Sequence, residues 1–317
     1  YISSHDAQWL SVKETAYIKN SWFIPEFIEL ATQHIATEML EHNKLVQWVE
    51  KAGISEPVQQ KQVGLVMAGN IPLVGFHDFL CVFLSGHQQM IKTSSKDDVL
   101  IRHLVHKMIE WQPTAAEYIS FSAMLKGCDA YIATGSDNSA RYFDYYFGRY
   151  PHIIRKNRTS VAILTGQENE ATLTALADDI MQYFGLGCRN VTQIYVPEGY
   201  DFVPLLQAIK NKYGFCFDHN KYRNNYDYQL AIYIMNQQFY MTNDCLVLIE
   251  NPAPYSPIGT LHYQYYTVQN LVYTSLENDD RIQLIVGEHG VKPGEAQQPA
   301  CTDYADGVDT MAFLKHL

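Results

Sequence analysis

The residue types that could perform covalent chemistry meet in one short turn around Cys188. Residues 183–190 are Tyr-Phe-Gly-Leu-Gly-Cys-Arg-Asn, and an apolar run typical of a β-strand follows over 191–197. Two glycines within three residues let the backbone approach another group closely. A thiol held there can face a cleft, and its thiolate is a strong nucleophile. We therefore expect Cys188 to be a covalent nucleophile, with an inert buried cysteine as the alternative.

Further polar residues follow other strand-like runs. Ligands of open α/β sheets bind at the carboxyl ends of the strands, so residues in these places are candidates for binding or catalysis. Each also has a simpler interpretation: a turn asparagine bonds its own backbone, a serine caps a helix, and a lysine ends a solvated strand. The candidates, in chain order, are Asn70, Lys92, Ser94, Gly135, Ser136 and Glu250.

The pattern of apolar residues predicts the elements that position these side chains. Residues 1–56 have helical spacing, with Gly53 as a stop. Residues 63–67, 76–84 and 88–92 predict a β-α-β unit of the parallel kind. Strands are expected at 129–133 and 160–164, and a helix over 173–184 leads to Cys188. Further strands are expected at 230–234, 245–250 and 281–286, and residues 213–228 are expected at a surface or interface. Alternating strands and helices indicate a doubly wound α/β architecture.

Composition excludes several classes of protein. The 317 residues allow two domains, and a net charge of −11 argues against nucleic acid as a partner. No apolar run is long enough to span a membrane. The six cysteines contain no CxxC pair, which favours neither a disulfide framework nor a metal site and suggests a reducing, cytoplasmic setting. Because the chain begins at Tyr1 and not at a methionine, it is compatible with a preceding segment.

Common cofactor and nucleophile motifs are absent from the sequence. No GxGxxG follows a strand-like run, and neither a P-loop nor a GxSxG nucleophile elbow occurs. The chemistry must therefore come from the scattered set of residues described above.

The order and spacing of that set resemble the aldehyde dehydrogenase superfamily, and within it the acyl-CoA reductases that include the fatty-acid reductases of bacterial luminescence. The resemblance extends from about Lys61 to the end of the chain. It is carried by the segments Met67–Pro72, Met90–Lys92, Tyr131–Ser136, Gly185–Thr192, Glu250 and Asp303–Thr310.

The resemblance implies an α/β fold like that of aldehyde dehydrogenases, with a doubly wound cofactor-binding domain, an α/β catalytic domain and an N-terminal helical segment. The expected parts are a helical segment over 1–60, a dinucleotide-binding domain over 61–158, a catalytic thiol domain over 159–290, and a tail over 291–317 that packs back on the core. By the same resemblance, we expect a homo-oligomer.

The resemblance also implies a role for each candidate. Cys188 would be the nucleophile, and the Asn70 amide with the Cys188 backbone N–H would hold the oxyanion. Lys92 and Ser94 would contact the adenosine ribose of NADPH, with NADH as the alternative cofactor. Gly135 and Ser136 would border the pyrophosphate or nicotinamide, and Glu250 would hold the nicotinamide ribose.

One departure from the hydrolytic aldehyde dehydrogenases indicates the reaction. Those enzymes carry a water-activating glutamate some thirty-odd residues before the cysteine, whereas residues 153–158 here are Ile-Ile-Arg-Lys-Asn-Arg. Without that base, a thioacyl-enzyme persists long enough to be reduced. We therefore expect reduction of an acyl-CoA, or another acyl thioester, to an aldehyde. The alternatives are a hydrolytic aldehyde dehydrogenase, with an acid such as Glu168 or Glu170 facing Cys188, and a non-catalytic acyl-binding or partner-docking homologue.

Overall fold

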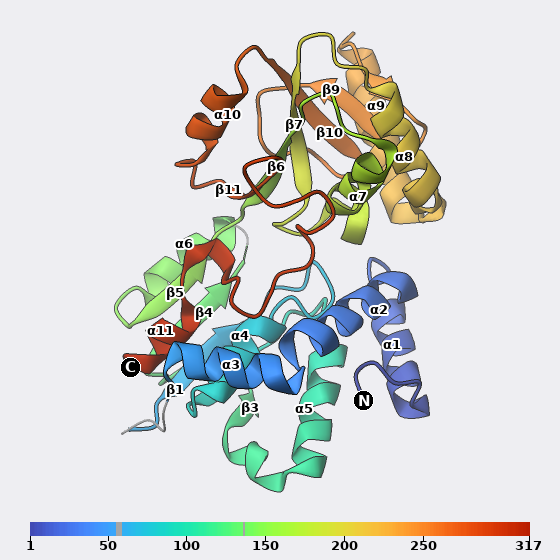
Figure 1. Ribbon diagram of the computed structural model, residues 1–317. Coiled ribbons are helices and arrows are strands. Elements are labelled where there is room, and N and C mark those ends of the chain that lie inside the picture. The colour runs from blue at the N-terminus through green and yellow to red at the C-terminus, as the bar shows by residue number, and fades with distance from the viewer. Residues whose placement is uncertain (55–58, 136) are drawn as a thin grey trace. The chain divides into compact units, whose positions relative to one another are not determined.

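The chain folds into two compact units in a computed structural model, which describes residues 1–54, 59–135 and 137–317 (Figure 1). The first unit comprises Tyr1–Asn157 and Pro299–Leu317, and the second comprises Arg158–Gln298. Each unit has its own sheet. Among the described residues, no helix combines the length and the apolar character needed to cross a membrane.

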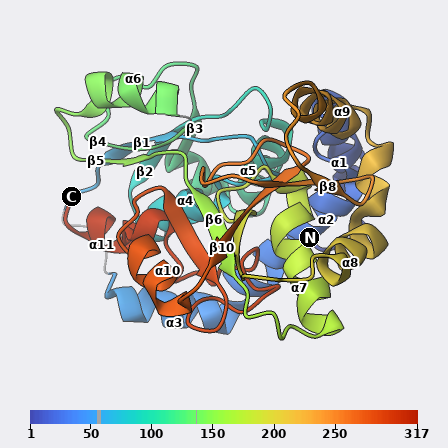
Figure 2. The ribbon, with the colours of Figure 1, turned by 90° about the horizontal axis from the view of Figure 1, so that it is seen from above.

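The first unit has a parallel sheet with the strand order β3-β2-β1-β4-β5. Figure 2 shows β2, β1 and β4 running side by side. This order places a topological switch point between β1 and β4. The helices and strands of this unit are α1 (Ala7–Lys19), α2 (Pro25–His34), α3 (His42–Ala52), β1 (Gln62–Val66), α4 (Phe76–Leu84), β2 (Gln88–Lys92), α5 (Val99–Trp111), β3 (Ile119–Phe121), β4 (Ala130–Thr134), α6 (Asp137–Phe147), β5 (His152–Arg155) and α11 (Thr310–Lys315).

The β-α-β unit expected from the sequence is confirmed as β1, α4 and β2. Its strands are short: β1 buries Val63, Gly64 and Leu65 in succession, and β2 buries Gln89 and Ile91. The helical character expected before Gly53 is also confirmed, and Gly53 ends α3 at a φ of 61°, which favours glycine.

The C-terminal residues pack into the first unit through a buried ion pair. Arg155 at the end of β5 donates to both carboxylate oxygens of Asp78 on α4, at 2.7 and 3.2 Å. The same guanidinium donates to Thr310 Oγ1 at 2.8 Å and to the Ala305 carbonyl at 2.6 Å. Burial opposes ionisation of Asp78, but Arg155 prevails and holds the pKa of that carboxyl below its usual value. Removing one partner of such a pair typically costs about 3–5 kcal/mol. Figure 1 shows the red helix α11 among the blue and cyan elements of this unit.

The second unit has a six-stranded sheet with the order β11-β6-β7-β10-β9-β8, in which β8 alone of the described strands pairs antiparallel. Helix α7 is the crossover between the parallel neighbours β6 and β7. The helices and strands are β6 (Thr159–Ile163), α7 (Glu170–Met181), β7 (Val191–Pro197), α8 (Val203–Tyr213), α9 (Asn220–Met235), β8 (Met241–Thr242), β9 (Val247–Glu250), β10 (Thr260–Tyr266), α10 (Gln269–Leu276) and β11 (Ile282–Val286).

One expected strand is wrong. Residues 230–234 belong to helix α9, and part of the expected surface segment 213–228 is buried as well. The buried residues of α9 are Tyr222, Tyr226 and Tyr233, and their spacing of four and seven is helical. The strand-favouring Ile232, Tyr233 and Ile234 near the end of this helix were a weaker signal than that spacing over sixteen residues.

Candidate functional site

Cys188 lies in a tight loop that enters the amino end of β7. The loop follows a 3₁₀ turn over Gln182–Gly185, in which Tyr183 and Phe184 have left-handed φ values of 54° and 57°. Such values are strained for aromatic residues, whereas Gly185 adopts its φ of 73° without cost. Both aromatic side chains are buried, and the Phe184 ring packs 4.7 Å from the His219 ring. The glycine-flanked turn of the sequence is thus a strained loop held by its surroundings.

Asn190 is the residue that holds this loop. Its side chain is fully buried, and its Nδ2 donates to the carbonyls of Asp179, Ile180 and Gln182, at 3.1, 3.4 and 2.9 Å. These carbonyls belong to the last turn of α7 and the residue after it, where a helix leaves acceptors unsatisfied. Its Oδ1 accepts the Gly187 backbone N–H at 2.8 Å. One amide therefore fixes both sides of the turn that carries Cys188.

A second buried side chain fixes Cys188 itself. Ser160, at the amino end of β6, donates its hydroxyl to the Cys188 carbonyl at 3.1 Å and is fully buried. Sequence reasoning assigned no role to Ser160 or Asn190. Polar residues at the starts of neighbouring parallel strands were the available signal, because such residues meet at one edge of the sheet.

Exposure distinguishes Cys188 from the other cysteines. All six lie in the described ranges, and Cys188 alone is not buried. Burial raises the pKa of the other five thiols, which are Cys81, Cys128, Cys216, Cys245 and Cys301. A thiol needs access and thiolate character to react. Cys188 is thus the cysteine best placed for chemistry.

The acids of the second unit that were candidate bases lie away from Cys188. Glu168 accepts from Thr165 N at 2.6 Å and Gly166 N at 3.1 Å, beyond the carboxyl end of β6. Glu170 is in the first turn of α7, whereas Cys188 follows its last turn. The twelve residues of α7 span about 18 Å.

Asp179 lies nearer, at the end of α7, but its carboxylate is occupied. One oxygen accepts the Gly294 N–H at 2.6 Å and the other accepts the Ala296 N–H at 3.0 Å. Burial raises the pKa of this fully buried carboxyl to about 7, although both N–H groups favour its ionised form. Asp179 therefore anchors the segment around Ala296 and has no oxygen directed to solvent.

Glu250 is exposed at the carboxyl end of β9 and starts a Pro-rich loop that is firmly anchored. Buried Gln193 donates to the Asn251 carbonyl at 2.9 Å. Buried His262 bonds the Ala253 carbonyl through Nδ1 at 2.7 Å, and Thr192 donates to the Pro254 carbonyl. Burial lowers the pKa of His262, and Nδ1 is the donor in this bond because a carbonyl oxygen only accepts. Side chains of β7 and β10 thus hold the backbone that follows Glu250.

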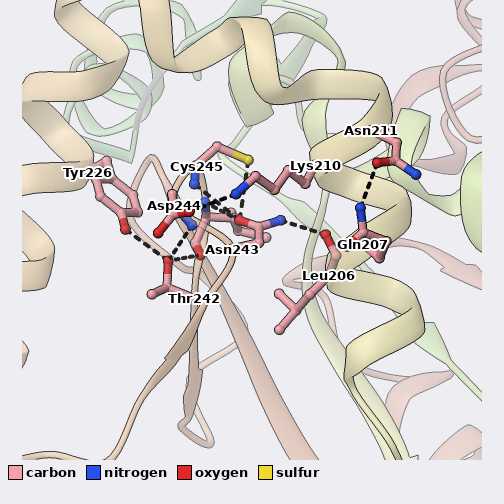
Figure 3. Close-up of polar contacts among 10 residues, drawn as sticks. Leu206, Gln207, Lys210, Asn211, Tyr226, Thr242, Asn243, Asp244 and Cys245 are labelled. Carbon is pink, nitrogen blue, oxygen red and sulfur yellow. Dashed lines mark hydrogen bonds and ion pairs between the residues drawn. The ribbon is translucent and has the colours of Figure 1, made fainter.

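The start of β9 is fixed by the turn at Asn243, shown in Figure 3. Asn243 Oδ1 accepts from the backbone N–H groups of Cys245 and Leu246, at 3.1 and 2.8 Å, and its Nδ2 donates to the Leu206 carbonyl on α8 at 2.8 Å (Figure 3). The Tyr226 hydroxyl of α9 bonds Thr242 Oγ1 at 2.8 Å. These contacts make Cys245 a structural residue and give β9 a defined entry.

In the first unit, the remaining candidates share one edge of the sheet. Val66 on β1 pairs with Lys92 on β2 and with Ala133 on β4. The residues after these positions, Asn70 and Gly135, therefore follow the carboxyl ends of adjacent strands. Asn70 and Lys92 are exposed, and Ser94 and Gly135 are partly buried. Ser136 lies outside the described residues.

Close packing explains two glycines at this edge. A Cβ on Gly69 would lie 2.6 Å from Ser94 Oγ, and one on Gly135 would lie 2.9 Å from the Phe143 ring. The Asn70 turn therefore approaches the segment that follows β2, and α6 starts close to the end of β4. Both approaches require glycine.

The two histidines that flank most of α4 bond backbone carbonyls. His77 Nε2 bonds the Cys301 carbonyl at 2.8 Å, and His87 Nε2 bonds the Leu314 carbonyl at 3.0 Å. In the part of the chain that the structure describes, no group of three or more His, Cys, Asp or Glu residues could hold a metal ion.

The role of Asn190 is testable through stability and amide exchange. Asn190→Ala leaves buried carbonyls of α7 without a donor and should lower the free energy of unfolding by about 3 kcal/mol. The Gly187 amide, which loses its acceptor, should exchange with solvent much faster in the variant. Asn169→Ala, which removes the exposed cap at the other end of α7, should cost only about 1 kcal/mol. If urea unfolding showed that Asn190→Ala and Asn169→Ala lose the same free energy of unfolding, or if the Gly187 amide exchanged at the wild-type rate, Asn190 would not hold the loop.

Comparison with known proteins agrees with this architecture. Residues 31–204, more than half of the chain, match the family model described as acyl-CoA reductase (LuxC). A curated relative, the long-chain acyl-protein thioester reductase of Aliivibrio fischeri, is 24% identical over 168 residues, which cover 48% of this chain and 35% of the relative. The aligned region is thus about a third of that relative's length.

Solved structures of low sequence identity share the fold. Aldehyde dehydrogenase 21 from Physcomitrella patens, in complex with succinate, aligns with a TM-score of 0.61 at 12% identity, covering 90% of this chain and 71% of that one. An NAD-dependent aldehyde dehydrogenase from Sinorhizobium meliloti aligns with a TM-score of 0.61 at 11% identity, covering 90% and 68%. The chain shares the fold of these aldehyde dehydrogenases, and it belongs to the acyl-CoA reductase (LuxC) family.

Proposed function

We propose that this protein reduces acyl-CoA, with a fatty acyl chain, to the aldehyde through a thioacyl-enzyme on Cys188 and with NADPH as the reductant. The observation that carries the proposal is the state of Cys188. It is a partly exposed thiol in a strained loop that Asn190 and Ser160 hold from two sides. Strain kept in place by surrounding contacts is typical of functional sites.

In the first half-reaction, the Cys188 thiolate attacks the acyl carbonyl. A bond forms between Sγ and the carbonyl carbon, the bond from that carbon to the CoA sulfur breaks, and CoA leaves as its thiolate. The Asn70 amide and the Cys188 backbone N–H donate to the oxyanion of the tetrahedral state. Loss of one such donor typically slows a reaction by about 10²–10³-fold.

The cofactor, when bound, supplies a hydride to the thioacyl carbon. The same donors hold the second oxyanion, and its collapse releases the aldehyde and returns Cys188 as a thiolate. Glu250 is proposed to hold the nicotinamide ribose, and the hydrogen bonds along the following loop support that role. The positions of Glu168, Glu170 and Asp179 support reduction over hydrolysis, because none of these acids is placed to activate water at Cys188.

The donor set at the end of β2 suits a phosphorylated ribose. Residues 92–96 are Lys-Thr-Ser-Ser-Lys, so an exposed ammonium and hydroxyls are available there. Arg102 on α5 stacks 4.4 Å from the Phe121 ring and donates to Thr93 Oγ1 at 3.4 Å. A carboxylate at this place recognises a free 2′-hydroxyl, and an arginine accommodates a 2′-phosphate. Arg102 therefore favours NADPH over NADH.

The reaction is tested by mixing the protein with saturated acyl-CoAs of graded length and NADPH. Wild-type protein should release one CoA and form one aldehyde for each NADPH oxidised. Cys188→Ala should abolish all three, because no thioacyl-enzyme forms. Cys128→Ala, which removes a buried thiol, should keep the wild-type rate. Release of carboxylic acid in place of aldehyde, or an active Cys188→Ala variant, would refute the mechanism.

The cofactor preference is tested by fluorescence titration with NADPH and NADH in the absence of substrate. Arg102→Leu removes the guanidinium and should weaken NADPH binding by about 10-fold or more, since a phosphate loses its charge-assisted partner. NADH binding should stay within about twofold, because its ribose carries no phosphate to pair with. Arg149→Leu, which removes another guanidinium stacked on an aromatic ring, is the matched control. Equal weakening of both cofactors would exclude Arg102 as the selective residue.

A further inference from the structure

Asp97 has a buried carboxyl group that the proposed chemistry leaves unused. Asp97 is 6% exposed, and the Oδ1 atom of its carboxyl group has no hydrogen-bond partner among the described residues. A buried polar atom without a partner is costly, so it needs an explanation in a native structure. Helix capping does not supply one, because the residue at the N-cap of α5 is Asp98 and its side chain makes no capping bond.

The other oxygen of Asp97 fixes the turn that carries Asn70. Asp97 Oδ2 accepts the Leu73 backbone N–H at 2.7 Å. Leu73 has a left-handed φ of 56°, which is strained for a leucine, and its side chain is buried. The carboxyl group therefore stabilises Leu73, the last residue of the Asn70–Leu73 turn, in a left-handed conformation that leucine normally avoids.

The same contact joins this turn to the segment that follows β2. Asp97 N donates to the Ser94 carbonyl at 3.1 Å, which closes a small loop over 94–97. Gly69 packs against Ser94, where a Cβ would lie 2.6 Å from the hydroxyl oxygen and 3.2 Å from the Asp97 Cβ. Asn70 and Ser94 thus belong to two segments that Asp97 holds together.

We propose that Asp97 is a positioning residue that holds the Asn70–Leu73 turn so that the Asn70 amide is directed at the acyl carbonyl. This inference rests on the proposed function, in which Asn70 is an oxyanion donor. A turn in strained backbone keeps its geometry only while the surrounding contacts determine it, so loss of the Leu73 contact displaces Asn70. Burial raises the pKa of Asp97 to about 7, in accord with a carboxyl whose partnerless oxygen carries a proton near neutrality.

An asparagine in this place keeps the contact. In Asp97→Asn the amide oxygen still accepts the Leu73 N–H, and the NH₂ group takes the place of the partnerless oxygen. In Asp97→Ala the acceptor is lost. Asp97→Val also removes the acceptor but fills a similar volume with apolar atoms, so it serves if the alanine variant does not fold.

The test is a double-mutant cycle measured by single-turnover CoA release from a saturated acyl-CoA, without nicotinamide cofactor. Asn70→Ala should slow release by about 100-fold. Asp97→Ala or Asp97→Val should slow release by at least about 10-fold. The acyl-CoA concentration that gives half the maximal release rate should stay within about threefold of wild type. If Asp97 acts through Asn70, the double variant should be no more than about twofold slower than Asn70→Ala. Asp97→Asn should recover the wild-type rate within about threefold.

Controls separate this inference from a general loss of structure. Asp98→Asn changes the adjacent carboxylate, which makes long surface ion pairs to Lys19 and Arg102, and should release CoA at the wild-type rate. Additive effects of the Asn70 and Asp97 variants, or an Asp97→Asn variant as slow as Asp97→Ala, would overturn the role of Asp97. If Asn70→Ala itself releases CoA at the wild-type rate, the oxyanion role in the proposed function fails instead.

Discussion

The proposed chemistry of the second unit depends on one interaction, the buried amide of Asn190. It satisfies three carbonyls at the end of α7 and the Gly187 N–H with a single side chain. The end of α7 leaves these carbonyls without partners in the helix, and the Asn190 amide donates to them. Because these bonds hold the loop, it stays rigid although two of its aromatic residues have left-handed φ values. A nucleophilic thiol needs such rigidity, since a thioester must meet it in one geometry. Asn190 thus links the end of α7 to the loop that carries the proposed nucleophile, Cys188.

The first unit meets a similar requirement by different means. The Asn70 turn contains a strained leucine, and the Asp97 carboxyl plays there the part that the Asn190 amide plays around Cys188. In both places a buried polar side chain bonds the backbone of the turn that carries the proposed functional residue. The strained left-handed residues thus lie near the proposed functional residues, and hydrogen bonds from the buried side chains stabilise that strained backbone.

The sequence predicted the regular elements that have one clear period. The β1-α4-β2 unit was confirmed because apolar spacing and glycine stops agree there. The helix expected over 173–184 was confirmed as far as Met181, whereas Tyr183 and Phe184 have left-handed backbone. The strand β10 was not predicted, and α9 was partly mistaken for a strand, because tyrosines in both suit either period. The roles of Asn190, Ser160 and Asp97 were not visible in the sequence, because each depends on contacts between segments that only the fold brings together. Cys188 could be singled out because its glycines and the matching turn motifs are local.

The central claim is that Cys188 carries an acyl group that water does not remove. It is tested most directly by the intact mass of the protein after mixing with a saturated acyl-CoA in the absence of nicotinamide cofactor, followed by peptide mapping. We predict one added acyl group, located on the peptide that contains Cys188, which persists for many turnover times and disappears as aldehyde when NADPH is added. Loss of that group as free carboxylic acid before NADPH is added, or its attachment to a different residue, would contradict the account.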